Sequence, residues 1–178
     1  MVKTKIAVLV SGGGTNLQAL LDAQREGVLT AVVCSRKALG SQAAFEAAIS
    51  QALSDHGVEL LVLAGFMSIL SADFTSRWPR RILNVHPSLI PAFCGKGFYG
   101  LKVHQAALDY GVKVTPATVH FVNEVPDGGE ILLQKAVEIQ PGDTPETLQR
   151  RVMEQAEWKL LPQATQMISE EIRREKDQ

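Results

Sequence analysis

The sequence has little cysteine and no long apolar run. Its two cysteines, Cys34 and Cys94, are far apart and form no C-x-x-C pair, which fits a reducing compartment. No apolar stretch approaches the roughly 18 residues that cross a bilayer. The apolar run at residues 6–10 is too short for the core of a signal peptide. We therefore expect a cytoplasmic protein with no membrane partner.

An excess of charge of one sign is also missing. Lys and Arg total 18 against 19 Asp and Glu, a net charge of −1. Because non-specific nucleic-acid binding depends on neutralising phosphates, this balance predicts no nucleic-acid partner. The histidines show no H-E-x-x-H or other metal-ligand spacing, so we expect no metal; they are His56, His86, His104 and His120. We predict that His104 and His120 are packing or solvent-facing residues, and that His56 ends a helix.

The remaining composition is that of one globular domain. The chain has 178 residues, 46% of them hydrophobic, so it can bury a core without disulfides or metals. Short apolar runs predict strands at residues 6–10, 31–34, 60–64, 82–85, 118–122 and 131–133. Helical spacing predicts helices at residues 17–26, 42–55, 71–77 and 103–110, and a long one that Asp143 or Thr144 caps. We expect Pro162 to kink or end that helix and residues 170–178 to fray.

Strands that alternate with helices predict an α/β fold. We expect a mainly parallel twisted sheet with helices on both faces and a C-terminal antiparallel hairpin. In such sheets ligands bind at the carboxyl ends of the strands, so the loops that follow the strands are the candidate sites.

The first of these loops is glycine-rich and runs S-G-G-G-T-N from Ser11 to Asn16. A strand, glycines and a helix start present free backbone N–H groups to an anion, which favours binding of a single phosphate. The loop is no dinucleotide fingerprint, because Leu17 stands where the third glycine would be, and no G-K-[ST] follows it. The alternative is a tight turn that Thr15 or Asn16 caps.

Asn84 and His86 end a predicted inner strand, and alternation places both side chains on one side. An amide and an imidazole there can stabilise an oxyanion and move protons; the alternative is a loop cap and a histidine bonded to backbone. Asp127 lies in a turn where aspartate often bonds its own backbone. Its functional interpretation is a carboxylate that keeps an imidazolium charged. The apolar loop at residues 65–70 can wall a flat ligand or belong to the core.

Together these segments resemble the phosphoribosylglycinamide formyltransferase family, from about residue 6 to residue 162. The matching motifs are S-G-G-G-T-N at 11–16, L-A-G-F-M at 63–67, N-V-H-P-S-L-I-P at 84–91, T-V-H-F-V at 118–122 and D-G-G at 127–129. The resemblance implies a formyltransferase-type fold. It implies transfer of the formyl group of 10-formyltetrahydrofolate, as co-substrate, to the amine of glycinamide ribonucleotide in purine biosynthesis.

The resemblance also implies a set of site residues. The catalytic trio would be Asn84, His86 and Asp127. The substrate would be held by Gly14, Thr15, Asn16 and Glu157. The folate would contact Met67, Ser68, Ile69, Leu70, Asn84, Asn123, Glu124, Val125, Pro126 and Asp127. Residues 1–83 would form the nucleotide-binding half of one domain and residues 84–178 the folate-binding and catalytic half, in a monomer or homodimer.

Three features depart from the family pattern. Gln42 stands where the family usually has a folate-site arginine, and the loop at residues 92–102 is long and glycine-rich. Leu29–Thr30–Ala31 joins directly what the family separates by about a strand and a helix, so we expect residues to be missing there, with a real deletion as the alternative.

Competing functions are also open. One is a formyltetrahydrofolate hydrolase, whose extra N-terminal domain we do not find; another is a non-catalytic mononucleotide-binding module. A methionyl-tRNA formyltransferase would need a further C-terminal domain and a basic surface.

Overall fold

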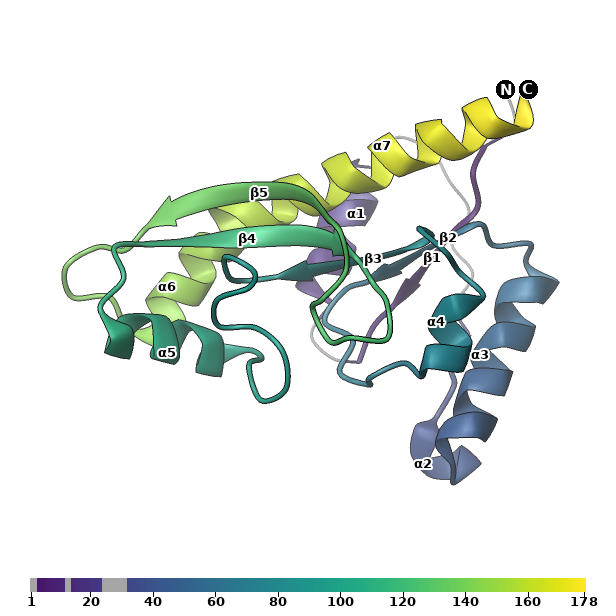
Figure 1. Ribbon diagram of the computed structural model, residues 1–178, viewed down its shortest axis with the longest axis horizontal. Helices are drawn as coiled ribbons and strands as arrows, with labels where there is room; N and C mark the ends of the chain where they lie inside the picture. The colour runs from purple at the N-terminus through teal and green to yellow at the C-terminus, as the bar shows by residue number, and fades with distance from the viewer. Residues whose placement is uncertain (1–2, 12–13, 24–31) are drawn as a thin grey trace.

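The computed structural model describes residues 3–11, 14–23 and 32–178, and its centre is a five-stranded sheet (Figure 1). The strands lie in sequence order: β1 (Ile6–Leu9), β2 (Leu60–Leu63), β3 (Ile82–His86), β4 (Val114–Phe121) and β5 (Ile131–Glu138). The first three pair in parallel, and β4 and β5 run antiparallel to their neighbours. The predicted α/β fold, with a parallel core and a C-terminal hairpin, is confirmed.

Helices cover both faces of this sheet. The chain forms α1 (Thr15–Ala23), α2 (Arg36–Leu39), α3 (Gln42–Asp55), α4 (Ala72–Ser76), α5 (Leu101–Tyr110), α6 (Pro145–Val152), a π-helical turn (Met153–Glu157) and α7 (Trp158–Lys176). The helices α1 and α7 lie on one face, and α3 and α4 lie on the other (Figure 1). Thr144 caps α6, Ser71 caps α4, and His56 ends α3, as the sequence predicts.

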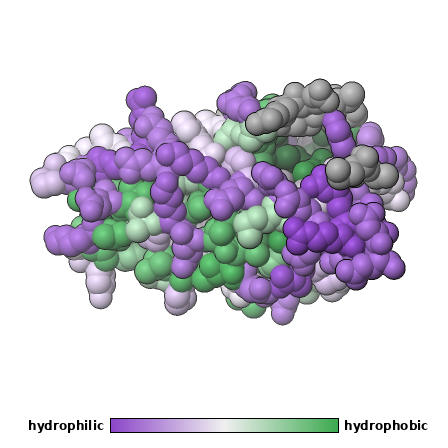
Figure 2. Space-filling view, turned by 90° about the horizontal axis from the view of Figure 1, so that it is seen from above, coloured by the Kyte–Doolittle hydropathy of each residue, from purple (hydrophilic) through white to green (hydrophobic). Residues whose placement is uncertain are grey.

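Two apolar cores separate because side chains alternate along each strand. In β2, Leu60 and Val62 belong to the core under α6 and α7, whereas Leu61 and Leu63 pack against α3 and α4. All four are buried, which is typical of an inner parallel strand. Seen from above, hydrophobic side chains show in the middle of the surface, and hydrophilic ones gather at the lower right (Figure 2).

The sequence predicts a strand at residues 31–34, but the described part of this segment, residues 32–34, forms none. The Val33 side chain there is 92% exposed. An apolar run forms a strand only where a neighbouring strand accepts its hydrogen bonds, and among the described residues β1 pairs with β2 alone. Ala31 and the junction at Leu29–Ala31 lie outside the described residues.

Pro162 does not end the last helix, which continues to Lys176. An internal proline costs about 3 kcal/mol. Beyond it the helix buries Ala164, Ile168 and Ile172 against the sheet, and each large apolar side chain contributes about 1.5–3 kcal/mol. The predicted fraying is wrong for residues 170–176, because ion pairs join Glu175 to Arg81 and Lys176 to Glu59.

Candidate active site

The carboxyl end of β3 brings together the polar side chains that the sequence singled out. His86 Nδ1 lies 3.6 Å from Asp127 Oδ2, and Asp127 Oδ1 lies 3.6 Å from His120 Nε2. His120 stands opposite Asn84 in the β3–β4 ladder, and Asn84 Nδ2 is 3.3 Å from His120 Nε2. Asn84, His86, His120 and Asp127 therefore form one cluster, which we call the polar cluster.

The hydrogen-bond partners determine where the ring hydrogens lie. His86 Nε2 is 2.9 Å from the carbonyl oxygen of Phe93, and a carbonyl can only accept, so Nε2 carries a hydrogen. A second proton on Nδ1 would face the Asp127 carboxylate. His120 Nδ1 likewise donates to the Phe121 carbonyl at 2.8 Å. The other ring nitrogen, His120 Nε2, faces both the Asn84 amide and the Asp127 carboxylate.

Asp127 is held as a carboxylate. Burial of Asp127 favours its neutral form and by itself raises its pKa. The hydrogen bond to His120, the charge of His86 and the Gly95 amide outweigh burial, so the pKa of Asp127 is lowered. The Gly95 N–H donates to Oδ2 at 2.8 Å. Asp127 has a φ of 55°, a strained value for a residue other than glycine. The turn after it needs Gly129, where a Cβ would lie 1.8 Å from the Phe121 carbonyl oxygen.

His120 is the site residue that the sequence interpretation missed. It is 1% exposed, so the expectation of a packing residue describes its burial but not its contact with Asn84 and Asp127. A register shift between Val119 and His120 interrupts the β4–β5 ladder at this point. Such bulges re-aim side chains next to functional sites, and nothing in the local sequence pattern announces one.

His104 is fully buried on α5, and neither ring nitrogen has a hydrogen-bond partner in the part of the chain that the structure describes. Burial, with a smaller contribution from the charge of His86, lowers the pKa of His104 to about 4. The prediction of a packing residue is confirmed here, and the ring is neutral at pH 7.

A second polar group joins the start of α1 to the π-helical turn. Asn16 and Glu157 are both buried, and Asn16 Nδ2 donates to Glu157 Oε2 at 2.8 Å. Burial raises the pKa of Glu157, and the Asn16 hydrogen bond only partly opposes this. Asn16 Oδ1 has no hydrogen-bond partner among the described residues. Gly14, with a φ of 69°, accepts the first helical hydrogen bond, whereas Gly12 and Gly13 lie outside the described residues.

The two apolar segments predicted to contact folate differ in exposure. Met67 and Ile69 are 59% and 63% exposed and Ser68 is half-buried, whereas Leu70 belongs to the core beside α3 and α4. Gln42 donates to the Ile69 carbonyl at 3.0 Å, so it links the start of α3 to this loop.

In the second segment Asn123 Oδ1 accepts from the Val125 amide at 2.9 Å, which is an Asx turn. Glu124, Val125 and Pro126 are exposed. This turn presents Asp127 to the polar cluster.

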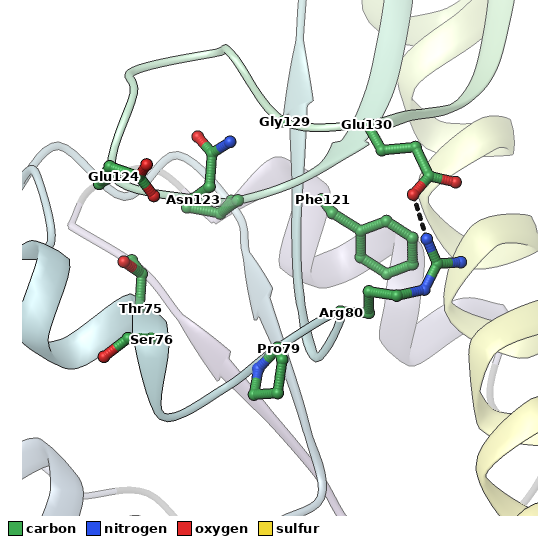
Figure 3. Close-up of a pocket in the computed structure, with 10 residues that line it drawn as sticks. Thr75, Ser76, Pro79, Arg80, Phe121, Asn123, Glu124, Gly129 and Glu130 are labelled. Atoms are coloured by element: carbon green, nitrogen blue, oxygen red, sulfur yellow. Dashed lines mark hydrogen bonds and ion pairs between the residues drawn. The ribbon is translucent and has the colours of Figure 1, made fainter.

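A cavity of ≈ 280 Å³ lies beside this second segment (Figure 3). Asn123 and Glu124 form one wall, and Thr75 and Ser76 from α4 form another. Phe121 also lines it, with the Arg80 guanidinium 4.4 Å from the centre of the Phe121 ring and paired with Glu130 (Figure 3). None of the residues 67–70 lines this cavity.

Among the described residues, no group of three or more His, Cys, Asp or Glu side chains is placed to hold a metal ion. No described helix is long and apolar enough to cross a membrane.

Comparison with known proteins gives consistent matches. Residues 28–165 match the family model described as "Formyl transferase". The phosphoribosylglycinamide formyltransferase of Haemophilus influenzae is 38% identical, over 97% of this chain and 91% of that protein. The chicken trifunctional purine biosynthetic protein adenosine-3 is 41% identical over 94% of this chain, which spans only 18% of that protein.

Solved structures agree with these matches. The phosphoribosylglycinamide formyltransferase of Brucella melitensis has a TM-score of 0.84 at 35% identity, covering 94% of this chain and 96% of that one. The glycinamide ribonucleotide transformylase 1 of Symbiobacterium toebii has a TM-score of 0.83 at 38% identity, covering 94% and 88%.

Proposed function

Since the chain belongs to the phosphoribosylglycinamide formyltransferase family, we propose that it transfers the formyl group of 10-formyltetrahydrofolate to the amine of glycinamide ribonucleotide. The family name implies a formyl donor of the folate type and small-molecule substrates. The products are formylglycinamide ribonucleotide and tetrahydrofolate, and the step belongs to purine biosynthesis.

The observation that carries the proposal is the convergence of Asn84, His86 and Asp127 at the end of β3. The substrate amine attacks the formyl carbon, a C–N bond forms, and the carbonyl oxygen becomes an oxyanion. The Asn84 amide and the Nδ1–H of a protonated His86 ring, whose Nε2–H is taken by the Phe93 carbonyl, are the donors that stabilise this charge.

Asp127, held as a carboxylate, places a negative charge 3.6 Å from His86 Nδ1 and so stabilises positive charge that develops on the ring during the reaction. Collapse of the intermediate breaks the bond between the formyl carbon and the folate nitrogen. That nitrogen takes up a proton while the attacking amine loses one, and His86 moves the proton between them.

Glycinamide ribonucleotide would bind at the start of α1, with its phosphate on the backbone of Gly14, Thr15 and Asn16. The support for this assignment is the buried side-chain oxygen of Asn16, next to Glu157, which no described residue partners. A ribose hydroxyl can donate to that oxygen. Binding of one anion by the free N–H groups of the glycine-rich loop stays a prediction, because Gly12 and Gly13 lie outside the described residues.

The folate would lie along the exposed apolar side chains of Met67, Ile69 and Val125, close to Asp127. Ser68, Asn123, Glu124 and Pro126 would contact it too, whereas buried Leu70 would act through its backbone and through packing. The division of one domain into halves at residues 83 and 84, a cytoplasmic location, a monomer or homodimer, and the lack of nucleic-acid and membrane partners stay predictions.

The test is transformylation by the purified protein with both substrates, with folate hydrolysis measured in the absence of the amine. Formyl transfer to the amine supports the proposal. Formate release that the amine does not suppress would identify a formyltetrahydrofolate hydrolase, the alternative that the same polar cluster allows. Nucleotide binding with neither reaction would identify a mononucleotide-binding module and refute the enzyme.

A further inference from the structure

The loop between β3 and α5 contacts both charged members of the polar cluster through its backbone. The Phe93 carbonyl accepts from His86 Nε2 at 2.9 Å, and two residues later the Gly95 amide donates to Asp127 Oδ2 at 2.8 Å. One short segment, Phe93–Gly95, therefore touches the outer side of the His86 ring and the carboxylate that faces its inner side.

Each contact limits what its partner can do. With a carbonyl on Nε2, the neutral His86 ring keeps its hydrogen there and turns its Nδ1 lone pair, or a second proton, towards Asp127. The Gly95 amide favours the charged carboxylate and holds its rotation. Without the segment, both side chains could rotate out of line.

We propose that Phe93–Gly95 is a positioning element, which sets the tautomer of His86 and the orientation of Asp127, and which α5 holds in place through Tyr110. This inference rests on the proposed function in one respect: His86 and Asp127, which the segment positions, are the pair assigned to catalysis. The segment touches neither substrate in this proposal, and acts through His86 and Asp127 alone.

The anchor is aromatic. Phe93 has a φ of 50°, a strained value that the surrounding structure must maintain. Its ring packs edge-on against Phe98, at 6.3 Å between centroids, and against Tyr110, at 5.9 Å. Tyr110 is the last residue of α5 and is 80% exposed, so this phenol stabilises little except Phe93. Such aromatic pairs contribute beyond their buried area and fix ring orientation.

Other titratable groups also face the pair, and none of them changes in the variants below. His120 lies 3.6 Å from Asp127 Oδ1. Burial and the charge of Asp127 raise the pKa of Cys94, and the charge of His86 helps to lower the pKa of His104.

The first test compares Gly95→Ala with Gly97→Ala. Both glycines have positive φ, 82° and 95°, and space for a Cβ, so the backbone strain is matched, but only Gly95 donates to Asp127. We expect Gly95→Ala to lower kcat about 10-fold or more and to move the acid limb of the kcat profile to higher pH, since a Cβ at this positive φ strains the backbone and turns the N–H of position 95 away from the carboxylate. KM for the nucleotide should stay the same. Gly97→Ala should match the unsubstituted protein, and equal effects of the two variants would overturn the proposal.

The second test does not need catalysis. In Tyr110→Leu, nitrogen NMR of the His86 ring at a pH where the ring is neutral should show a smaller population with the hydrogen on Nε2. Tyr99→Leu removes a phenol from the same loop and should leave that population unchanged. Tyr99 contacts Lys102 instead of Phe93. An unchanged tautomer in Tyr110→Leu would refute the anchor, even if Gly95→Ala fails to fold. If Tyr110→Leu shows the tautomer shift while the unsubstituted protein shows no transformylation, the proposed function is refuted and the positioning element is supported.

Discussion

Replacement of His104 by leucine should change how the stability of the protein depends on pH. The ring is fully buried, neither nitrogen is hydrogen-bonded to a described residue, and the pKa of His104 is lowered from 6.5 to about 4. Leucine removes the titrating group, keeps the site apolar and breaks no hydrogen bond within the protein. The polar cluster keeps all of its members.

The sign follows from proton binding. Because the folded-state pKa lies below the unfolded one, the unfolded chain binds more protons between pH 6.5 and 4, so the free energy of unfolding falls as the pH falls through this window. At about 1.4 kcal/mol for each pKa unit, full protonation costs the folded state about 3 kcal/mol. Above pH 7 the effect vanishes.

The assay is urea denaturation followed by circular dichroism at a series of pH values from 8 to 4. The advantage of His104→Leu over the unsubstituted protein should grow by about 3 kcal/mol from pH 8 to pH 4. His56→Gln, at an exposed helix end, is the control and should follow the unsubstituted protein. If the two stability curves for His104→Leu and the unsubstituted protein run parallel over the whole range, His104 does not titrate as its burial requires.

The remaining predictions concern the two polar groups and the core. Asp127→Asn and His86→Ala should each lower kcat by about 10²–10⁴-fold. The double variant should lose far less than the product of the two single losses, because the two residues act as a unit. Multiplicative losses in kcat, measured at saturating substrate, would contradict the coupling. Glu157→Gln should raise the KM for the nucleotide more than it lowers kcat. Glu157→Gln should also raise the free energy of unfolding above pH 5. An acid whose pKa is raised in the folded state destabilises the fold at a pH where the same acid ionises in the unfolded chain. A urea denaturation series that shows no gain in the free energy of unfolding at pH 8 would argue against a buried neutral Glu157. Leu70→Ala should cost about 2–5 kcal/mol of stability in urea denaturation, as core truncations do, and a loss below 1 kcal/mol would mean that Leu70 is not packed in the core.

Local patterns predicted the sheet and part of the polar cluster. Apolar runs mark β2 and β3 because buried parallel strands need them, and simple alternation placed Asn84 beside His86. The position of Asp127 next to them came from the family resemblance. A turn rich in glycine and aspartate does not reveal which distant strand it approaches.

What could not be predicted depends on contacts between distant segments. His120 reaches Asn84 through the β3–β4 register and an irregularity in the hairpin, and neither leaves a mark in the sequence nearby. The helix through Pro162 persists because burial against the sheet outweighs a local penalty. Residues 32–34 have the composition of a strand but no strand beside them among the described residues.

The π-helical turn at Met153–Glu157 keeps the buried side chains of α6 and α7 on the side of the helix that faces the sheet. Buried side chains follow one another every four residues from α6 into α7, at Leu148, Val152, Ala156, Leu160, Ala164, Ile168 and Ile172. Four residues of an α-helix turn about 400°, so such a stripe drifts about 40° with each repeat and would wind off the sheet. A wider turn uses one residue more for nearly the same rotation and sets the stripe back. Removing a single residue there would rotate everything beyond it by about 100°, and would turn Glu157 away from Asn16 while the helix itself became more regular.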